Sequence, residues 1–214
     1  MKEYNLELMI QGHEIWMEPT KEDNDSVSVD LLFGHNMRID GIADKSRFLT
    51  TYFSPDEKQG EINLVSAEDR HYLNFNPTTE GYYSVYADMG AVIYSINEDG
   101  YNKGPKHMFK GVTYSGAFHQ MAKTIVPVGN VGEFQGKPLH GILEIVPRRV
   151  LNSVGSEVEP TVYYEDKPLT GVDVKAISGA EGKEIACIPT DQNGVVTIPL
   201  SAQGKWMFLA RYAD

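Results

Sequence analysis

Residues 27–33 read VSVDLLF, and this stretch decides the fold class. Its apolar side chains recur at every second position, at Val27, Val29, Leu31 and Phe33. A period of two places these side chains on one face of an extended chain, while the residues between them face the other way. The stretch therefore predicts a β-strand with one buried face.

Segments on both sides of this stretch have the same strand character, and clusters of turn-forming residues such as Ser54-Pro55-Asp56 separate several of them. The predicted strands are residues 4–10, 27–33, 48–53, 61–66, 71–75, 82–88, 91–96, 124–128, 142–146, 158–164, 172–177, 184–188, 195–200 and 206–212. One stretch has helical spacing, at Tyr114, Phe118, Met121 and Ala122. We therefore expect an all-β fold with at most one short helix, over residues 114–122.

A domain boundary is predicted near residues 136–141, because the strand pattern beyond it is shorter and more regular. Short strands separated by turn signals are typical of a β-sandwich. The expectation is two β-sandwich domains of the immunoglobulin-like or prealbumin-like kind. The first would cover residues 1–138 and the second residues 139–214.

The composition excludes several classes of partner. With 19 basic and 30 acidic residues, the formal net charge is −11, so a phosphate backbone would be repelled and nucleic acid is not an expected partner. No apolar run approaches the length needed to insert into a membrane. Cys187 is the single cysteine, which excludes an intrachain disulfide and a cysteine-based metal site.

The compartment stays open at the level of sequence. The start of the chain, residues 1–5, lacks a basic segment followed by an apolar stretch, so it does not look like a signal peptide. Two interpretations fit: a cytoplasmic protein with a native Met1, or an exported protein whose leader has been replaced by Met1.

Six histidines are present, and none forms a local metal motif such as HxH or HExxH. Any metal site must therefore be assembled in three dimensions. The best candidates are His13 and His35, since each follows a glycine at the end of a strand-like segment. Neutral imidazole suits nickel, cobalt, zinc or copper. Two imidazoles alone leave a site open, and His119 is the expected third donor.

No motif for enzyme chemistry is visible: the chain has no nucleophile elbow, phosphate-binding glycine loop or dinucleotide fingerprint. A non-enzymatic binding protein is therefore expected. Two alternatives remain at this stage. The first is a carbohydrate-binding module that uses exposed aromatic side chains such as Tyr82, Tyr83, Tyr86 and Tyr94. The second is a structural or interaction module.

Several short motifs, taken in order, resemble a known family of nickel-uptake-associated proteins, grouped as DUF4198 or NikM-like. The opening carries Gly12-His13-Glu14-Ile15-Trp16-Met17-Glu18-Pro19 and then Phe33-Gly34-His35-Asn36. The later motifs are Tyr82-Tyr83 to Tyr86-Ala87, Ala122-Lys123 before Val128-Gly129, Leu143 to Pro147, Lys167 to Val172, Thr190 to Gly194, and Gly204-Lys205-Trp206. The resemblance covers nearly the whole chain.

This resemblance implies a function and a location. It implies an extracytoplasmic accessory to nickel or cobalt import that delivers metal to a membrane transporter. It also implies an immunoglobulin-like C-terminal half, similar to modules that accompany carboxypeptidases and carbohydrate-binding proteins. His13 and His35 match histidine positions of the family, so the resemblance implies a metal role for both.

Overall fold

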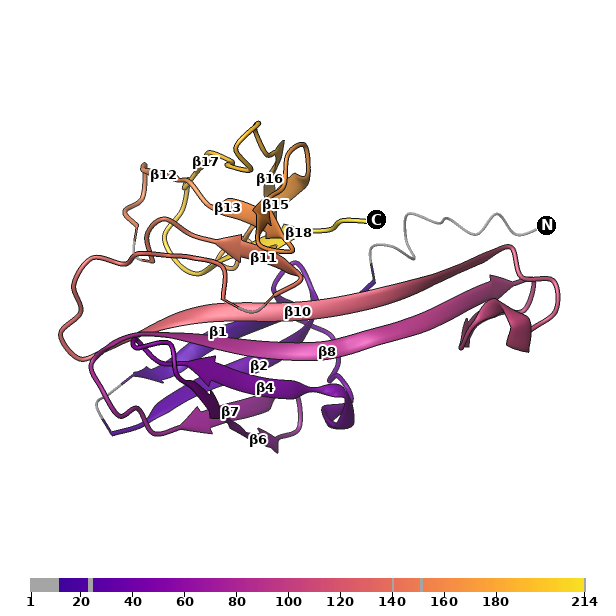
Figure 1. Ribbon diagram of the computed structural model, residues 1–214, viewed down its shortest axis with the longest axis horizontal. Coiled ribbons are helices and arrows are strands. Elements are labelled where there is room, and N and C mark those ends of the chain that lie inside the picture. Colours follow the sequence, from indigo (N-terminus) through magenta and orange to yellow (C-terminus); the bar gives the residue numbers. More distant parts are fainter. Residues whose placement is uncertain (1–11, 23–24, 140, 151, 214) are drawn as a thin grey trace.

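The computed structural model describes residues 12–22, 25–139, 141–150 and 152–213 (Figure 1). These residues form an all-β protein made of small antiparallel sheets. The helices in the described part are two short 3-10 turns, η1 (Lys45–Arg47) and η2 (Lys106–Met108). Within the same ranges, no helix is long and apolar enough to cross a membrane.

The first sheet, sheet A, has the strand order β1-β2-β7-β6, with the short strand β3 paired to the end of β2. Its strands are β1 (Glu14–Glu22), β2 (Val27–His35), β3 (Arg38–Ile39), β6 (Asn63–Ser66) and β7 (His71–Phe75). The alternation that predicted a strand over residues 27–33 is confirmed, because Val27, Val29 and Leu31 of β2 all point into the main core.

The second sheet, sheet B, has the order β10-β8-β4-β5, with β9 beside β8. Its strands are β4 (Leu49–Phe53), β5 (Gln59–Glu61), β8 (Gly81–Asn97), β9 (Gly100–Lys103) and β10 (Tyr114–Val128). In the long β8–β10 ribbon, two residues of β8, Met89 and Gly90, lie opposite the single residue Gln120 of β10. This β-bulge sets Gly90 at a positive φ of 64°, a conformation that glycine adopts without steric cost.

Residues 91–119 lie beyond this bulge, and we call them the arm. The arm extends away from the body of the molecule (Figure 1), and the main core contains no residue from it. Instead it has a small aromatic cluster of its own, in which the Phe118 ring lies 6.0 Å from that of Tyr94 and 6.5 Å from that of Tyr114.

The main core lies between sheets A and B and is built from the inward side chains of both. Its buried members are Ile15, Met17, Val27, Val29, Leu31, Ala43, Ile62, Leu73, Phe75, Tyr83, Val85, Ala87, Met89, Ala122, Val126 and Val128. Burial of so many apolar side chains at one interface is the main force that holds the two sheets together.

The C-terminal part of the chain forms three smaller sheets around a second apolar core that includes Val162, Val174 and Ile198. The sheets have the orders β11-β13-β14, β12-β17 and β16-β15-β18. Their strands are β11 (Leu143–Val146), β12 (Glu157–Val158), β13 (Thr161–Tyr164), β14 (Lys167–Pro168), β15 (Asp173–Ser178), β16 (Lys183–Pro189), β17 (Ile198–Pro199) and β18 (Trp206–Ala210).

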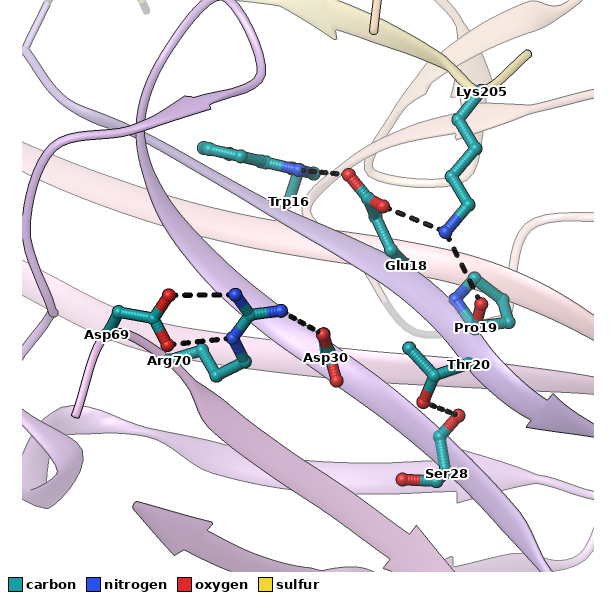
Figure 2. Close-up of polar contacts among 9 residues, drawn as sticks. All are labelled: Trp16, Glu18, Pro19, Thr20, Ser28, Asp30, Asp69, Arg70 and Lys205. Atoms are coloured by element: carbon teal, nitrogen blue, oxygen red, sulfur yellow. Dashed lines mark hydrogen bonds and ion pairs between the residues drawn. The ribbon is translucent and has the colours of Figure 1, made fainter. Parts of the chain in front are cut away.

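A third apolar cluster joins the C-terminal sheets to the outer face of sheet A. Trp16 and Leu32 of sheet A pack there with Ile177 of β15 and Met207 of β18. Beside the cluster, the Lys205 ammonium donates to Oε2 of Glu18 at 2.8 Å, and the Trp16 indole donates to the other oxygen at 3.0 Å (Figure 2). Sheet A is therefore covered on both faces.

A buried aspartate on the same outer face is neutralised by an arginine. Asp30 is only 5% exposed, and Nη1 of Arg70 donates to its Oδ2 at 2.6 Å (Figure 2). The Arg70 guanidinium also makes two hydrogen bonds to Asp69. Because an unpaired buried carboxylate would be strongly destabilising, Arg70 makes the burial of Asp30 tolerable.

A second buried carboxylate connects β11 to the long ribbon of sheet B. Oε1 of Glu144 accepts hydrogen bonds from the Tyr86 hydroxyl at 2.7 Å and from the Lys123 ammonium at 2.5 Å. The backbone amides of Leu139 and Gly141 donate to the same carboxylate. Burial and the Glu144 charge raise the pKa of Tyr86, which therefore remains a proton donor.

The structure corrects the sequence-based prediction of secondary structure in two places. The short helix predicted over residues 114–122 is wrong, because this segment is strand β10, paired with β8 along its length. Tyr114 and Phe118 are four residues apart, which fits a strand as well as a helix. The strands predicted over residues 82–88 and 91–96 are parts of one strand, β8.

Strand β1 was not predicted, since Glu14, Ile15, Trp16 and Met17 are all buried and leave no alternation of polar and apolar residues. The strand predicted over residues 4–10 lies outside the described residues. The division into two β-sandwich domains at residue 138 stays a prediction.

Candidate metal centre

The pairing of β1 with β2 brings His13 and His35 together. Glu14 lies opposite Gly34 in this antiparallel pair, so the residue before Glu14 and the residue after Gly34 are neighbours across the strands. The two imidazole ring centroids are 4.5 Å apart. The sequence-based expectation that these two rings converge is therefore met, while their metal role remains a prediction.

A tight hairpin adds a carboxylate to the pair. His35 is paired with Arg38 across a two-residue turn, whose residues Asn36 and Met37 have φ values of 51° and 59°. Positive φ at both central residues is the geometry of a type I′ turn, which suits the twist of the flanking strands. The turn reverses the chain, so that Asp40 returns to the side of β2 that carries His35.

The Asp40 carboxylate contacts both rings. Its Oδ2 is 2.5 Å from Nδ1 of His35, and its Oδ1 is 3.5 Å from Nε2 of His13. One ligand atom from each of the three side chains falls within 4.8 Å of the others. Among the described residues, this is the group of histidine, cysteine and acidic side chains whose geometry could hold a metal ion.

Two contacts hold His13 in place. The Phe33 ring stacks on the His13 ring at a centroid distance of 4.4 Å and an interplanar angle of 14°. The side-chain amide of Gln120 donates to the backbone carbonyl of His13 at 2.8 Å. Gln120 is the residue opposite the β-bulge. Sheet B therefore holds the backbone of His13 in position through this hydrogen bond.

A buried glutamate supports the hairpin from the other face of the sheet. Glu14 is 8% exposed, and its Oε2 accepts a hydrogen bond from the backbone amide of Asn36 at 2.7 Å. Its Oε1 lies 4.0 Å from Nη2 of Arg211, near the C-terminal end of the chain. These contacts fix the turn between His35 and Asp40.

The arrangement is open to solvent and has the donor types of a transition-metal site. The side chains of His13, His35 and Asp40 are 48%, 51% and 42% exposed. Two imidazoles and one carboxylate leave further coordination positions for water, as in exchangeable rather than structural sites. Ligand atoms about 2.0–2.2 Å from a common ion lie roughly 3 Å apart, so the short His35–Asp40 contact would lengthen on binding.

His119, the third donor expected from the sequence, is not part of this group. Its Nε2 lies 2.6 Å from Oδ1 of Asp88, which also accepts the backbone amide of Gly90. His119 thus forms a polar contact within the bulge of the β8–β10 ribbon. Asp40 is not evident from the sequence pattern, because it lies in a segment with no strand pattern. The signal that points to it is Asn36, an asparagine at the position of a hairpin turn.

The remaining histidines have other environments. His71 is 2% exposed, and its ring contacts the Ser66 hydroxyl at 3.0 Å and the Ala43 carbonyl at 2.8 Å. His107 lies on the short turn η2. His140 is outside the described residues. None of these three belongs to the candidate metal centre formed by His13, His35 and Asp40.

Comparison with known proteins gives one result. A family model described as "Domain of unknown function (DUF4198)" matches residues 10–214. The matched range includes all three members of the candidate metal centre as well as the C-terminal sheets. No curated protein matches the chain.

Proposed function

The chain belongs to the DUF4198 family, and on this premise we propose that it is a non-enzymatic protein that binds a divalent transition-metal ion through His13, His35 and Asp40. The observation that carries the proposal is the convergence of two imidazoles and a carboxylate from three different strand ends. Stacking on Phe33 and the short contact with Asp40 orient the rings before any ion arrives, which reduces the entropy lost on binding.

The donor set narrows the choice of metal. Imidazole nitrogen with one carboxylate suits nickel, cobalt, zinc or copper, whereas calcium and magnesium prefer a shell of oxygen atoms. Affinity at such a site increases from cobalt through nickel to copper. We propose nickel or cobalt as the biological ion, because the sequence resembles the NikM-like proteins of nickel and cobalt uptake.

The exposure of the site supports a role in delivery. A half-exposed site with free coordination positions lets water or a receiving ligand enter, so the ion can be exchanged. Together with the resemblance to the NikM-like proteins, this exposure leads us to propose an accessory that passes its ion to a membrane transporter; the location outside the cytoplasm is proposed from the resemblance alone. The two predicted β-sandwich domains would hold the site at the end of the N-terminal sheet A.

Calorimetric titration tests this proposal. Nickel, cobalt and zinc are titrated into the wild type, a His13→Ala/His35→Ala variant, Asp40→Ala, and two matched controls, His119→Ala and His107→Ala. We expect one ion per chain in the wild type and no measurable binding in the double variant. Asp40→Ala should weaken binding at least about tenfold, which is the effect of losing even a group that only orients a ligand. Both controls should match the wild type.

Three results would contradict the proposal or its ligand set. Absence of binding by the wild type, or equal binding by the double variant, would end the metal assignment. If His119→Ala lost nickel binding and Asp40→Ala kept it, the third metal ligand would be His119 and not Asp40.

The carbohydrate-binding alternative gains no support from the tyrosines that suggested it. Tyr83 and Tyr86 are 0% and 2% exposed, so they cannot stack on a sugar ring. Tyr82 is in edge contact with Phe134 and donates to the Gly132 carbonyl. Tyr94, in the arm, is half-buried and in edge contact with Phe118.

A further inference from the structure

The β2–β3 hairpin that contributes two members of the candidate metal centre also contacts the C-terminal sheets. His35 and Asp40 lie at its two ends, and Met37 and Arg38 lie between them. Each of these two middle residues contacts the turn between β15 and β16, residues 179–182. Residues 35–40 therefore contribute two ligands to the candidate metal centre, and they also form an interface with the C-terminal sheets.

Met37 makes the apolar part of this contact. It packs against the cluster of Trp16, Leu32, Ile177 and Met207 that joins sheet A to the C-terminal sheets. Its Cε lies 3.1 Å from the position that a Cβ atom would take on Gly179. A side chain at position 179 would therefore require the end of the Met37 side chain to shift by a few tenths of an ångström.

Arg38 makes the polar part. Its Nη2 donates to the backbone carbonyl of Glu181 at 3.4 Å, and its guanidinium lies directly against Gly182. On the other side of the turn, Glu14 links the Asn36 amide to Arg211. The hairpin is thus held by C-terminal residues at both Met37–Arg38 and Asn36.

We propose that ion binding at His13, His35 and Asp40 and the seating of residues 179–182 on the hairpin are positively linked; this inference rests on the proposed function. Both events restrict the same hairpin, residues 35–40. Whichever happens first bears the entropy cost of ordering the hairpin, so the second becomes more favourable. By reciprocity, the ion tightens the interface and the interface tightens the ion by the same factor.

Hydrogen–deuterium exchange with and without nickel measures the first half of this linkage. The reporters are amides at the interface, Gly179 N bonded to the Lys205 carbonyl and Gly182 N bonded to the Ser178 carbonyl. Saturating nickel should slow exchange in a peptide covering residues 177–184 by about fivefold or more, the lower end of typical coupling. Calorimetry on the same sample records whether nickel is bound.

A double variant separates the linkage from general effects of the ion. Met37→Ala/Arg38→Ala keeps every member of the metal centre but removes both contacts. It should still bind nickel, although several-fold more weakly than the wild type, and nickel should no longer slow exchange in residues 177–184. The matched control, Met108→Ala/Arg148→Ala, changes an exposed methionine and an exposed arginine elsewhere and should behave as the wild type.

Met207→Ala tests the reciprocal half from the far side of the interface, where no residue of the metal centre is touched. This variant should bind nickel several-fold more weakly than the wild type, with Met108→Ala unchanged. Nickel binding without any change in exchange, or unchanged affinity in Met207→Ala, would overturn the linkage and leave the proposed function standing. Absence of nickel binding by the wild type would overturn both.

Discussion

At the scale of single residues, Glu144 is a buried carboxylate whose negative charge is stabilised by its neighbours. Burial alone would raise its pKa, but the Lys123 ammonium and the hydrogen bonds from Gly141 and Tyr86 outweigh burial and hold the pKa below its usual value of 4.5. Since the pKa is lower in the folded than in the unfolded chain, ionised Glu144 stabilises the fold above about pH 4.5. This stabilisation is lost as the pH falls through the folded-state pKa.

We therefore expect Glu144→Gln to reduce the free energy of unfolding at pH 7 by about 3–5 kcal/mol, because it leaves the Lys123 ammonium buried without its counter-charge. Urea unfolding at pH 7 and pH 4 measures the loss, which should shrink at the lower pH. The double variant Lys123→Met/Glu144→Leu removes both charges and should recover most of the stability. A Glu144→Gln protein within about 1 kcal/mol of the wild type would contradict this account.

Two of the three members of the candidate metal centre could be selected from the sequence, and the third could not. His13 and His35 could be chosen because imidazole has few roles at a strand end other than capping and ligation. Asp40 could not, since 30 acidic residues made any one carboxylate uninformative. Its role depends on the two-residue turn at Asn36–Met37, which returns the chain beside β2.

At the scale of elements, the long β8–β10 ribbon depends on the bulge at Gly90. The φ of Gly90 is 64°, and a Cβ atom added there would meet nothing within 4 Å, so an alanine would suffer from backbone strain alone. Gly90→Ala should cost about 1–2 kcal/mol of stability. The matched control is Gly132→Ala, which has equal space and no positive φ and should change stability by less than about 0.5 kcal/mol. Equal thermal unfolding of the two variants would contradict the role assigned to the bulge.

At the same scale, the alternation of apolar and polar residues predicts some strands and fails for others. Strand β7 alternates between buried and less buried residues and was predicted from that pattern. Strand β2 was predicted from its inward residues Val27, Val29 and Leu31, although Asp30 and Leu32 on its outer face are buried as well. Strand β1 is buried on both faces, so its sequence carries no alternation. In β10, aromatic residues four apart fit both periods, and pairing with β8 decided the outcome.

At the scale of the whole molecule, one small apolar cluster connects the C-terminal sheets to sheet A. Ile177 is fully buried in that cluster, so Ile177→Ala leaves a cavity and should cost about 2–5 kcal/mol. The matched control, Ile93→Ala, is 41% exposed in the arm and should cost less than about 1 kcal/mol. Urea unfolding followed by circular dichroism measures both. Similar costs for the two variants would show that the cluster contributes little.

The arm gives the molecule a shape that departs from a sphere. A ribbon that extends beyond the core moves through water with extra friction, so the protein should tumble more slowly than a compact sphere of 23.9 kDa. Its rotation should also depend on direction, being fastest about the long axis of the ribbon. The amide N–H bonds of β8 point across this axis, because the hydrogen bonds of antiparallel strands are perpendicular to the strands. Their nuclear magnetic relaxation rates would then differ from those of N–H bonds elsewhere in the protein that point along the axis.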